Sequence, residues 1–101
     1  MKILYMGTPD FAVPALERLI EDGHEIALVV TQPDKPVGRK QVLTPPAVKV
    51  CALAHDLPVY QPTSMKTDDC YATLAAIGAD AIIVVAYGKI LPKRILDLTP
   101  H

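Results

Sequence analysis

The chain has 101 residues, of which 50% are hydrophobic, and a formal net charge of −1 at pH 7. Its length suits one domain or part of one, its apolar content excludes a disordered chain, and its charge excludes a uniformly basic nucleic-acid binder. The longest apolar run is far shorter than the ~20 residues that a membrane span needs, so we predict no membrane partner.

Strands and helices alternate along the sequence. The three longer strands are continuous apolar runs, which is typical of a parallel sheet covered on both faces, and a helical apolar stripe marks the segments between them. The first half of the chain predicts a strand at Lys2–Met6, a helix with an apolar stripe from Ala12 to Ile20, and a strand at Ile26–Val30. A helix capped by Thr44 follows, which is predicted to bury Ala47, Val50, Cys51 and Ala54. The second half predicts an edge strand at Leu57–Tyr60, a helix capped by Thr67 or Asp68, a strand at Ala81–Ala86, and a short helix from Pro92 that carries Ile95 and Leu96.

This alternation predicts an α/β fold of three layers, with a doubly wound parallel sheet in the strand order 3-2-1-4. The outer edge of the strand Ala81–Ala86 is then bare, and the final helix has no predicted partner. A long unpaired apolar strand is a dimerisation hazard. We therefore expect a further strand after His101, with residues 1–101 as the front part of a larger domain. Self-association through residues 81–86 is the alternative.

The two cysteines, Cys51 and Cys70, lie outside any C-x-x-C pair, and no secretory signal precedes them. We interpret both as free, buried thiols of a cytoplasmic protein. A zinc site needs further ligands at suitable spacing, so we predict no metal.

In doubly wound sheets, ligands bind beyond the carboxyl ends of the strands. The segment after the first strand has a single glycine, Gly7, followed by Pro9 and Asp10. Pro9 lacks a backbone donor and Asp10 is negative where a pyrophosphate would lie, which argues against dinucleotide binding.

Two other segments at this edge have an unusual composition. The loop from Gln32 to Thr44 is long and carries Lys35, Arg39 and Lys40 against a single acid, Asp34. Such cations hold nucleic-acid phosphates, although composition alone favours a solvated surface loop with scattered charge. In the segment Tyr87-Gly88-Lys89-Ile90-Leu91-Pro92, Gly88 permits a tight turn close to a flat heterocycle, or marks an ordinary strand-to-helix turn.

Four strings of this sequence resemble the amino-terminal part of the methionyl-tRNA formyltransferase family. They are MGTPDFAVPALERL from Met6, VVTQPDKPVGRK with LTPPAVK, the short LPVYQP, and DAIIVVAYGKILPKRIL, and the resemblance runs from Met1 to His101. The first two are specific to that family, whereas AYGKILP is shared more widely among transferases that use formyltetrahydrofolate.

The resemblance implies a Rossmann-like domain of an enzyme that moves a formyl group from 10-formyltetrahydrofolate to initiator methionyl-tRNA. It implies tRNA contacts for Arg39, with Lys35 and Lys40 beside it, although Lys40 and Gln41 depart from the common Gly-Lys pattern. Phe11 is expected to line the aminoacyl pocket. The residues that match the pterin-binding loop are Tyr87, Gly88, Lys89, Ile90, Leu91 and Pro92.

The family's catalytic Asn, His and Asp are not carried over, because this chain contains no asparagine and His101 lacks the Ser-Leu-Leu-Pro that should follow. The family's carboxy-terminal barrel is also absent from residues 1–101. We therefore expect a fragment that is inactive alone. The alternatives are a self-standing binding module, or a related folate-dependent formyltransferase that acts on sugars or free folate.

Overall fold

Four parallel strands form the central sheet, in the order β5-β2-β1-β6. The computed structural model describes residues 1–98. The strands are β1 (Lys2–Gly7), β2 (Glu25–Val30), β5 (Val59–Tyr60) and β6 (Ala81–Val85). Because β5, β2, β1 and β6 are the third, second, first and fourth predicted strands, the predicted order 3-2-1-4 is confirmed.

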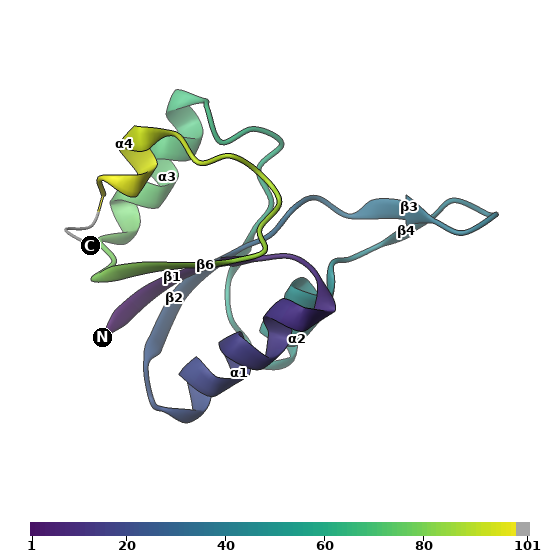
Figure 1. Ribbon diagram of the computed structural model, residues 1–101, viewed down its shortest axis with the longest axis horizontal. Coiled ribbons are helices and arrows are strands. Elements are labelled where there is room, and N and C mark those ends of the chain that lie inside the picture. Colours follow the sequence, from purple (N-terminus) through teal and green to yellow (C-terminus); the bar gives the residue numbers. More distant parts are fainter. Residues whose placement is uncertain (99–101) are drawn as a thin grey trace.

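Helices cover both faces of the sheet and complete three layers (Figure 1). The 3-10 turn η1 (Asp10–Ala12) leads into α1 (Val13–Glu21), which lies with α2 (Ala47–Ala54) on one face. The other face carries α3 (Asp68–Ile77) and α4 (Lys93–Leu96).

Each face of the sheet has its own apolar core. Along β1, Ile3 and Tyr5 contribute to the core beneath α1 and α2, whereas Leu4 and Met6 contribute to the core beneath α3 and α4. The register of β1 against β2 shifts between Ile3 and Leu4, where β2 holds one extra residue. Ile26 and Leu28, two residues apart on β2, therefore contribute to opposite cores, whereas a regular strand would place them on the same face.

The second helix begins later than predicted. Thr44 does not cap it: α2 starts at Ala47, and the Thr44 hydroxyl donates to the Val42 carbonyl at 3.0 Å. Pro46 disfavours a helical conformation at the residue before it, and Pro46 itself is extended, with ψ of 150°. The buried residues of α2 are Val48 and Ala52 rather than the predicted Ala47, Val50, Cys51 and Ala54.

The third and fourth helices form a packed pair. The Thr67 hydroxyl accepts from the Cys70 amide at 3.1 Å, which confirms the predicted cap. The prediction that α4 has no partner is wrong, because Arg94 contacts α3 through Asp68 at 3.0 Å and lies 4.8 Å from the Tyr71 ring centroid. Of the two apolar residues that this helix was predicted to carry, Ile95 is buried and Leu96 is exposed.

The predicted loop after β2 contains an antiparallel hairpin of β3 (Lys35–Val37) and β4 (Val42–Thr44). It extends away from the body of the protein (Figure 1), and all of residues 35–44 are exposed. We call residues 35–44 the arm.

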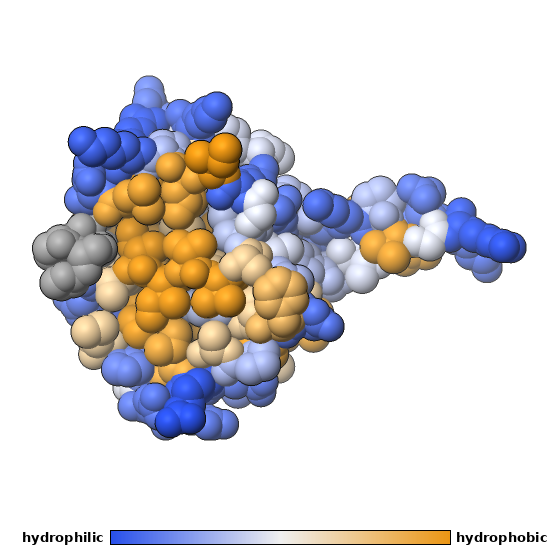
Figure 2. Space-filling model, viewed as in Figure 1, coloured by the Kyte–Doolittle hydropathy of each residue, from blue (hydrophilic) through white to orange (hydrophobic). Residues whose placement is uncertain are grey.

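Strand β6 pairs with β1 on one side, and within residues 1–98 no strand pairs with its other side. Its residues are mostly half-buried, and Val84 is 43% exposed. Figure 2 shows a broad apolar area on the face where β6 crosses the front of the view. The bare edge predicted for this strand is confirmed for the described part of the chain.

Candidate functional site

The carboxyl ends of β1, β2 and β6 are tied together by side chains that follow each strand. The Thr8 hydroxyl donates to the Tyr87 carbonyl at 2.7 Å, and the Gln32 amide nitrogen Nε2 donates to the same carbonyl at 3.1 Å. The backbone N–H of Gln32 donates to the Thr8 oxygen at 3.4 Å. Three loops at the ligand edge of the sheet are therefore held in one arrangement.

A second network extends from this point to the base of the arm. The Gln61 Nε2 donates to the Gln32 carbonyl at 3.1 Å and to Asp34 Oδ1 at 2.7 Å, and the Lys49 ammonium lies 3.1 Å from Asp34. The hydrogen bond from Gln61, followed by the one from Lys49, lowers the pKa of Asp34. The only acidic side chain of residues 32–44 is thus engaged at the base of the arm.

Gly88 has a backbone conformation that favours glycine and lies against the side-chain amide of Gln32. Its φ is +97°, and a Cβ at this position would overlap Nε2 of Gln32. A side chain would therefore both strain the backbone and displace the amide that holds the Tyr87 carbonyl. The positive φ agrees with the backbone freedom for which the sequence analysis invoked this glycine, although no hydrogen-bonded turn forms at Gly88 within the described residues.

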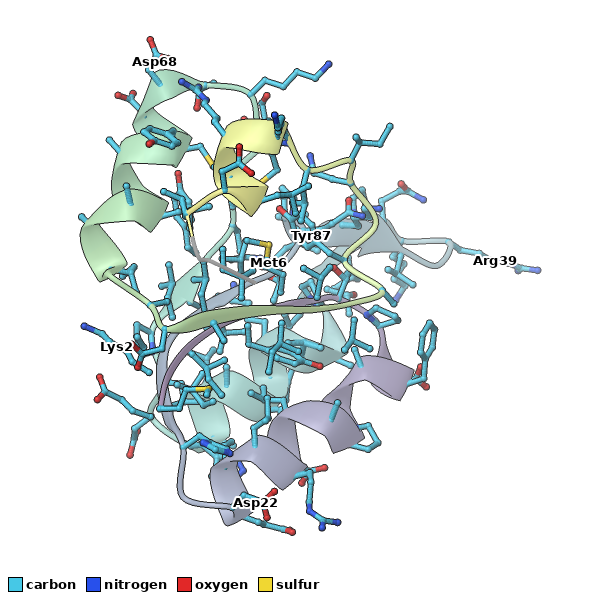
Figure 3. The ribbon with its side chains drawn as sticks, turned by 60° about the vertical axis from the view of Figure 1, so that its left-hand side comes forward. Lys2, Met6, Asp22, Arg39, Asp68 and Tyr87 are labelled. Atoms are coloured by element: carbon cyan, nitrogen blue, oxygen red, sulfur yellow. The ribbon has the colours of Figure 1, made fainter. Side chains whose placement is uncertain are left out.

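The Tyr87 side chain points into the core rather than outward at the carboxyl ends of the strands. It is buried, lies near Met6 (Figure 3), and its hydroxyl donates to the Met65 sulfur at 3.3 Å. Burial raises the pKa of Tyr87 to about 12. Its ring is occupied by packing, and its carbonyl already accepts two hydrogen bonds, so this residue supports the turn from within.

The rest of the segment 87–92 borders a cleft of about 280 Å³. The Lys89 ammonium donates to the Thr63 carbonyl at 2.7 Å, which closes one side of this cleft. Ile90 is 88% exposed at its rim, whereas Leu91 and Pro92 are half-buried. We call this space the lysine cleft; its lining residues are Thr63, Ser64, Met65, Lys66, Lys89 and Ile90.

A second cleft, of about 210 Å³, lies between the turn after β1 and the base of the arm. Its lining is mostly apolar and rich in proline, with Lys35 as its one cation among the described residues. We call it the arm cleft; it is lined by Thr8, Pro9, Asp10, Pro33, Lys35, Val37, Thr44, Pro45, Pro46 and Ala47. Phe11 is 69% exposed on η1, next to this lining but not part of it.

The three predicted cations are separated along the arm. Lys35 lies at its base beside the arm cleft, Lys40 lies in the turn, and Arg39 lies at the far end and points away from the body (Figure 3). Within residues 1–98, no ion pair involves any of the three. The arm therefore presents uncompensated positive charge to solvent.

Sequence reasoning missed the polar residues that organise this edge, namely Thr8, Gln32 and Gln61. A signal was available, since the first two closely follow buried strands, but the residues they bind are distant in the chain. The basic arm and the Tyr87–Pro92 segment do lie at the same sheet edge, as predicted.

The strand order defines a doubly wound α/β protein, a class in which ligands bind at the carboxyl ends of the strands. Within that class, the chain belongs to the formyl transferase family, whose family model matches residues 1–101. The structure is also similar to phosphoribosylglycinamide formyltransferase from Bacillus halodurans, with a TM-score of 0.68 and 13% identity, over 97% of this chain and 51% of that one. At this identity the likeness supports the fold alone.

Curated relatives are more similar in sequence. A methionyl-tRNA formyltransferase from Hydrogenovibrio crunogenus is 55% identical over 101 residues, which cover all of this chain and 32% of the relative. One from a Geobacillus species is 56% identical over 97 residues, which cover 96% of this chain and 30% of the relative. The resemblance found in the sequence is confirmed, and the chain spans about a third of the length of these relatives.

Among residues 1–98, none of the helices has the length and apolar character to cross a membrane.

Proposed function

We propose that this chain is the amino-terminal part of an enzyme that transfers the formyl group of 10-formyltetrahydrofolate to the amino group of initiator methionyl-tRNA. The observation that carries the proposal is an identity of 55–56%, over at least 97 residues, to proteins named methionyl-tRNA formyltransferase. The chain is inactive alone on this proposal. Attack of an amine on a formyl carbon needs an oxyanion stabiliser and a proton acceptor, which the family's absent Asn, His and Asp would supply.

In this proposal the arm binds the tRNA. Three exposed cations on a narrow hairpin suit the phosphates of a nucleic-acid backbone, and Arg39 at the far end reaches furthest from the body. Lys49 and Gln61 support this role because they engage Asp34, which would otherwise repel phosphate near the base of the arm. The methionyl end of the tRNA would then come near the exposed ring of Phe11, beside the arm cleft.

The folate is assigned to the Tyr87–Pro92 segment and the lysine cleft. The segment offers backbone polar groups and the exposed apolar side chain of Ile90 to a flat ring system. Gly88 allows a ligand to approach the main chain closely, and Tyr87 fixes the turn from the core. Leu91 and Pro92 complete the apolar side of this surface, and no metal takes part in the transfer.

The free edge of β6 is assigned to strand pairing. In the longer protein a further strand would pair there, and in the isolated chain a second copy would take its place. Val84, 43% exposed on this strand, would then be covered.

A chimera tests the catalytic proposal directly. Residues 1–101 would replace the equivalent third of the Geobacillus relative, and formylation of methionyl-tRNA would be measured, with circular dichroism to check folding. We expect turnover from the chimera and none from the isolated chain. A folded chimera without activity, or an isolated chain as active as the chimera, would contradict the proposal.

A further inference from the structure

Three side chains with metal-binding atoms meet on the α1–α2 side of the protein. Glu17 comes from α1, Cys51 from α2, and His55 is the residue that caps the carboxyl end of α2. Their ligand atoms all lie within 4.8 Å of one another. The cysteine and the histidine are four residues apart, a spacing that places two side chains on the same face of a helix.

The helices beneath these side chains are held by a shared core. Leu16, which precedes Glu17, is buried with Val48 and Ala52 of α2, and Cys51 packs against the same cluster. The backbone positions of the three residues are therefore set by packing rather than by a mobile loop. This kind of support pre-organises a site.

The three side chains have no competing partners in the described part of the chain. Within residues 1–98, neither an ion pair nor a side-chain hydrogen bond involves Glu17, Cys51 or His55. Glu17 and His55 are exposed and Cys51 is half-buried. The exposed side chains of Glu17 and His55 can thus rotate toward the Cys51 sulfur without breaking other interactions.

We propose that Glu17, Cys51 and His55 bind a zinc-like divalent cation. Thiolate, imidazole and carboxylate are the ligands that zinc uses, and three protein ligands with a water in the fourth position make a complete tetrahedral shell. Bond lengths of that shell separate the ligand atoms by about 3.3 to 3.6 Å. The observed spread of up to 4.8 Å needs only side-chain rotation to reach it.

The site is independent of the proposed formyl transfer. His55 ends the helix that leads into β5, toward the amino ends of the strands, whereas the arm and the lysine cleft lie at their carboxyl ends. The sequence predicted no metal because two thiols alone lack the further ligands that zinc needs. The tertiary structure supplies one of those ligands, Glu17, from another helix.

Cobalt is the spectroscopic probe for the test. The purified, reduced, metal-free chain would be titrated with Co²⁺ and then with Zn²⁺. We expect a thiolate-to-cobalt charge-transfer band that Zn²⁺ abolishes, and that is lost in Cys51→Ser. His55→Gln and Glu17→Gln should each weaken Zn²⁺ binding by at least about tenfold, the lower end of what even an outer-shell partner contributes.

Matched controls are available on the same elements. Glu21→Gln on α1 and His24→Gln in the following turn should leave the affinity unchanged, with folding checked by circular dichroism. In the unmutated chain, Zn²⁺ should also slow alkylation of Cys51, as located by peptide mass spectrometry. A band that persists in Cys51→Ser, equal affinities in all four Glu and His variants, or alkylation insensitive to Zn²⁺ would overturn the proposal.

Discussion

Gly88 and Gln32 show how single residues position the ligand edge. The amide of Gln32 occupies the space where any side chain at position 88 would begin, and it uses that space to hold the Tyr87 carbonyl. A side chain at position 88 would therefore displace the Gln32 amide from the Tyr87 carbonyl. The turn after β6 is therefore held by a contact between residues far apart in the chain, which the sequence alone did not reveal.

We expect Gly88→Ala to lower the free energy of unfolding by about 2 kcal/mol or more, since it combines a positive φ with loss of the Gln32 hydrogen bond. Urea denaturation would measure the loss. Gly23→Ala is the matched control, because Gly23 has a φ of +82° and open space around it. Equal losses in the two variants would show that the contact with Gln32 contributes nothing.

The burial of Tyr87 predicts a specific loss of stability at high pH. An unfolded tyrosine has a pKa of about 10, whereas in the fold the pKa of Tyr87 is raised to about 12. Its contribution is complete below pH 10 and is lost as the pH rises toward 12, because only the unfolded state releases the proton in that range. The slope contributed by one such group is at most about 1.4 kcal/mol per pH unit.

Tyr87→Phe should therefore flatten the fall in unfolding free energy between pH 10 and 12, as measured by urea denaturation at several pH values. Part of the fall should remain, because burial also raises the pKa of Tyr5 and Tyr60. An identical pH dependence in the variant and the parent chain would contradict the assignment of a buried, protonated Tyr87.

At the scale of elements, the arm departs most from its prediction. Its composition of prolines, glycine and cations indicated a loop, yet residues 35–37 pair with 42–44 across a tight turn at Gly38, whose φ is +78°. The pairing is short and every residue is exposed, so no burial pattern marks it in the sequence. A hairpin holds Arg39 at a defined distance from the arm cleft, whereas a flexible loop would let that distance vary.

Arg39→Ala in the chimera should weaken initiator tRNA binding. The slope of log K against the logarithm of the salt concentration should become shallower by about 0.7 to 0.9 for each phosphate that the arm no longer neutralises. Folate binding should be unchanged, because the arm does not line the lysine cleft. Filter binding at several salt concentrations would measure the first effect, and fluorescence titration with folate the second.

Arg18→Ala is the control for this change, because Arg18 is an exposed arginine on α1 whose side chain pairs with Asp22. It should leave both affinities unaltered. Wild-type tRNA affinity in Arg39→Ala would exclude the role proposed for the arm.

At the scale of the whole molecule, the apolar area around β6 decides how the isolated chain behaves. The strand is covered by α3 and α4 on one face and by the α1 side on the other, but its edge and Val84 face solvent. An unpaired apolar edge of this kind favours pairing with a second copy.

We expect the isolated chain to self-associate with increasing concentration, and Val84→Lys to shift it toward the monomer, because a charge on an edge strand opposes pairing. Sedimentation velocity over a range of concentrations would measure this. Leu53→Lys, at a similarly exposed apolar position on α2, should have no such effect. A parent chain that stays monomeric throughout would contradict the proposed pairing.

Much of the architecture follows from the sequence by itself. Continuous apolar runs identified three parallel strands, the shorter run at Leu57–Tyr60 identified the edge strand, and Thr67 marked the start of α3. These features are local, so propensity and periodicity suffice to predict them. The strand order followed from the right-handedness of crossovers, which leaves few alternatives for four strands.

Other features depended on contacts between distant segments, and only the tertiary structure decided them. The face of α2 that is buried was set by two preceding prolines and by packing on α1. The Thr8–Gln32–Tyr87 network, the anchoring of the arm through Gln61 and the meeting of Glu17 with Cys51 and His55 each join residues from different elements. Such contacts form because packing fixes where whole elements lie, and no local pattern in the sequence records that arrangement.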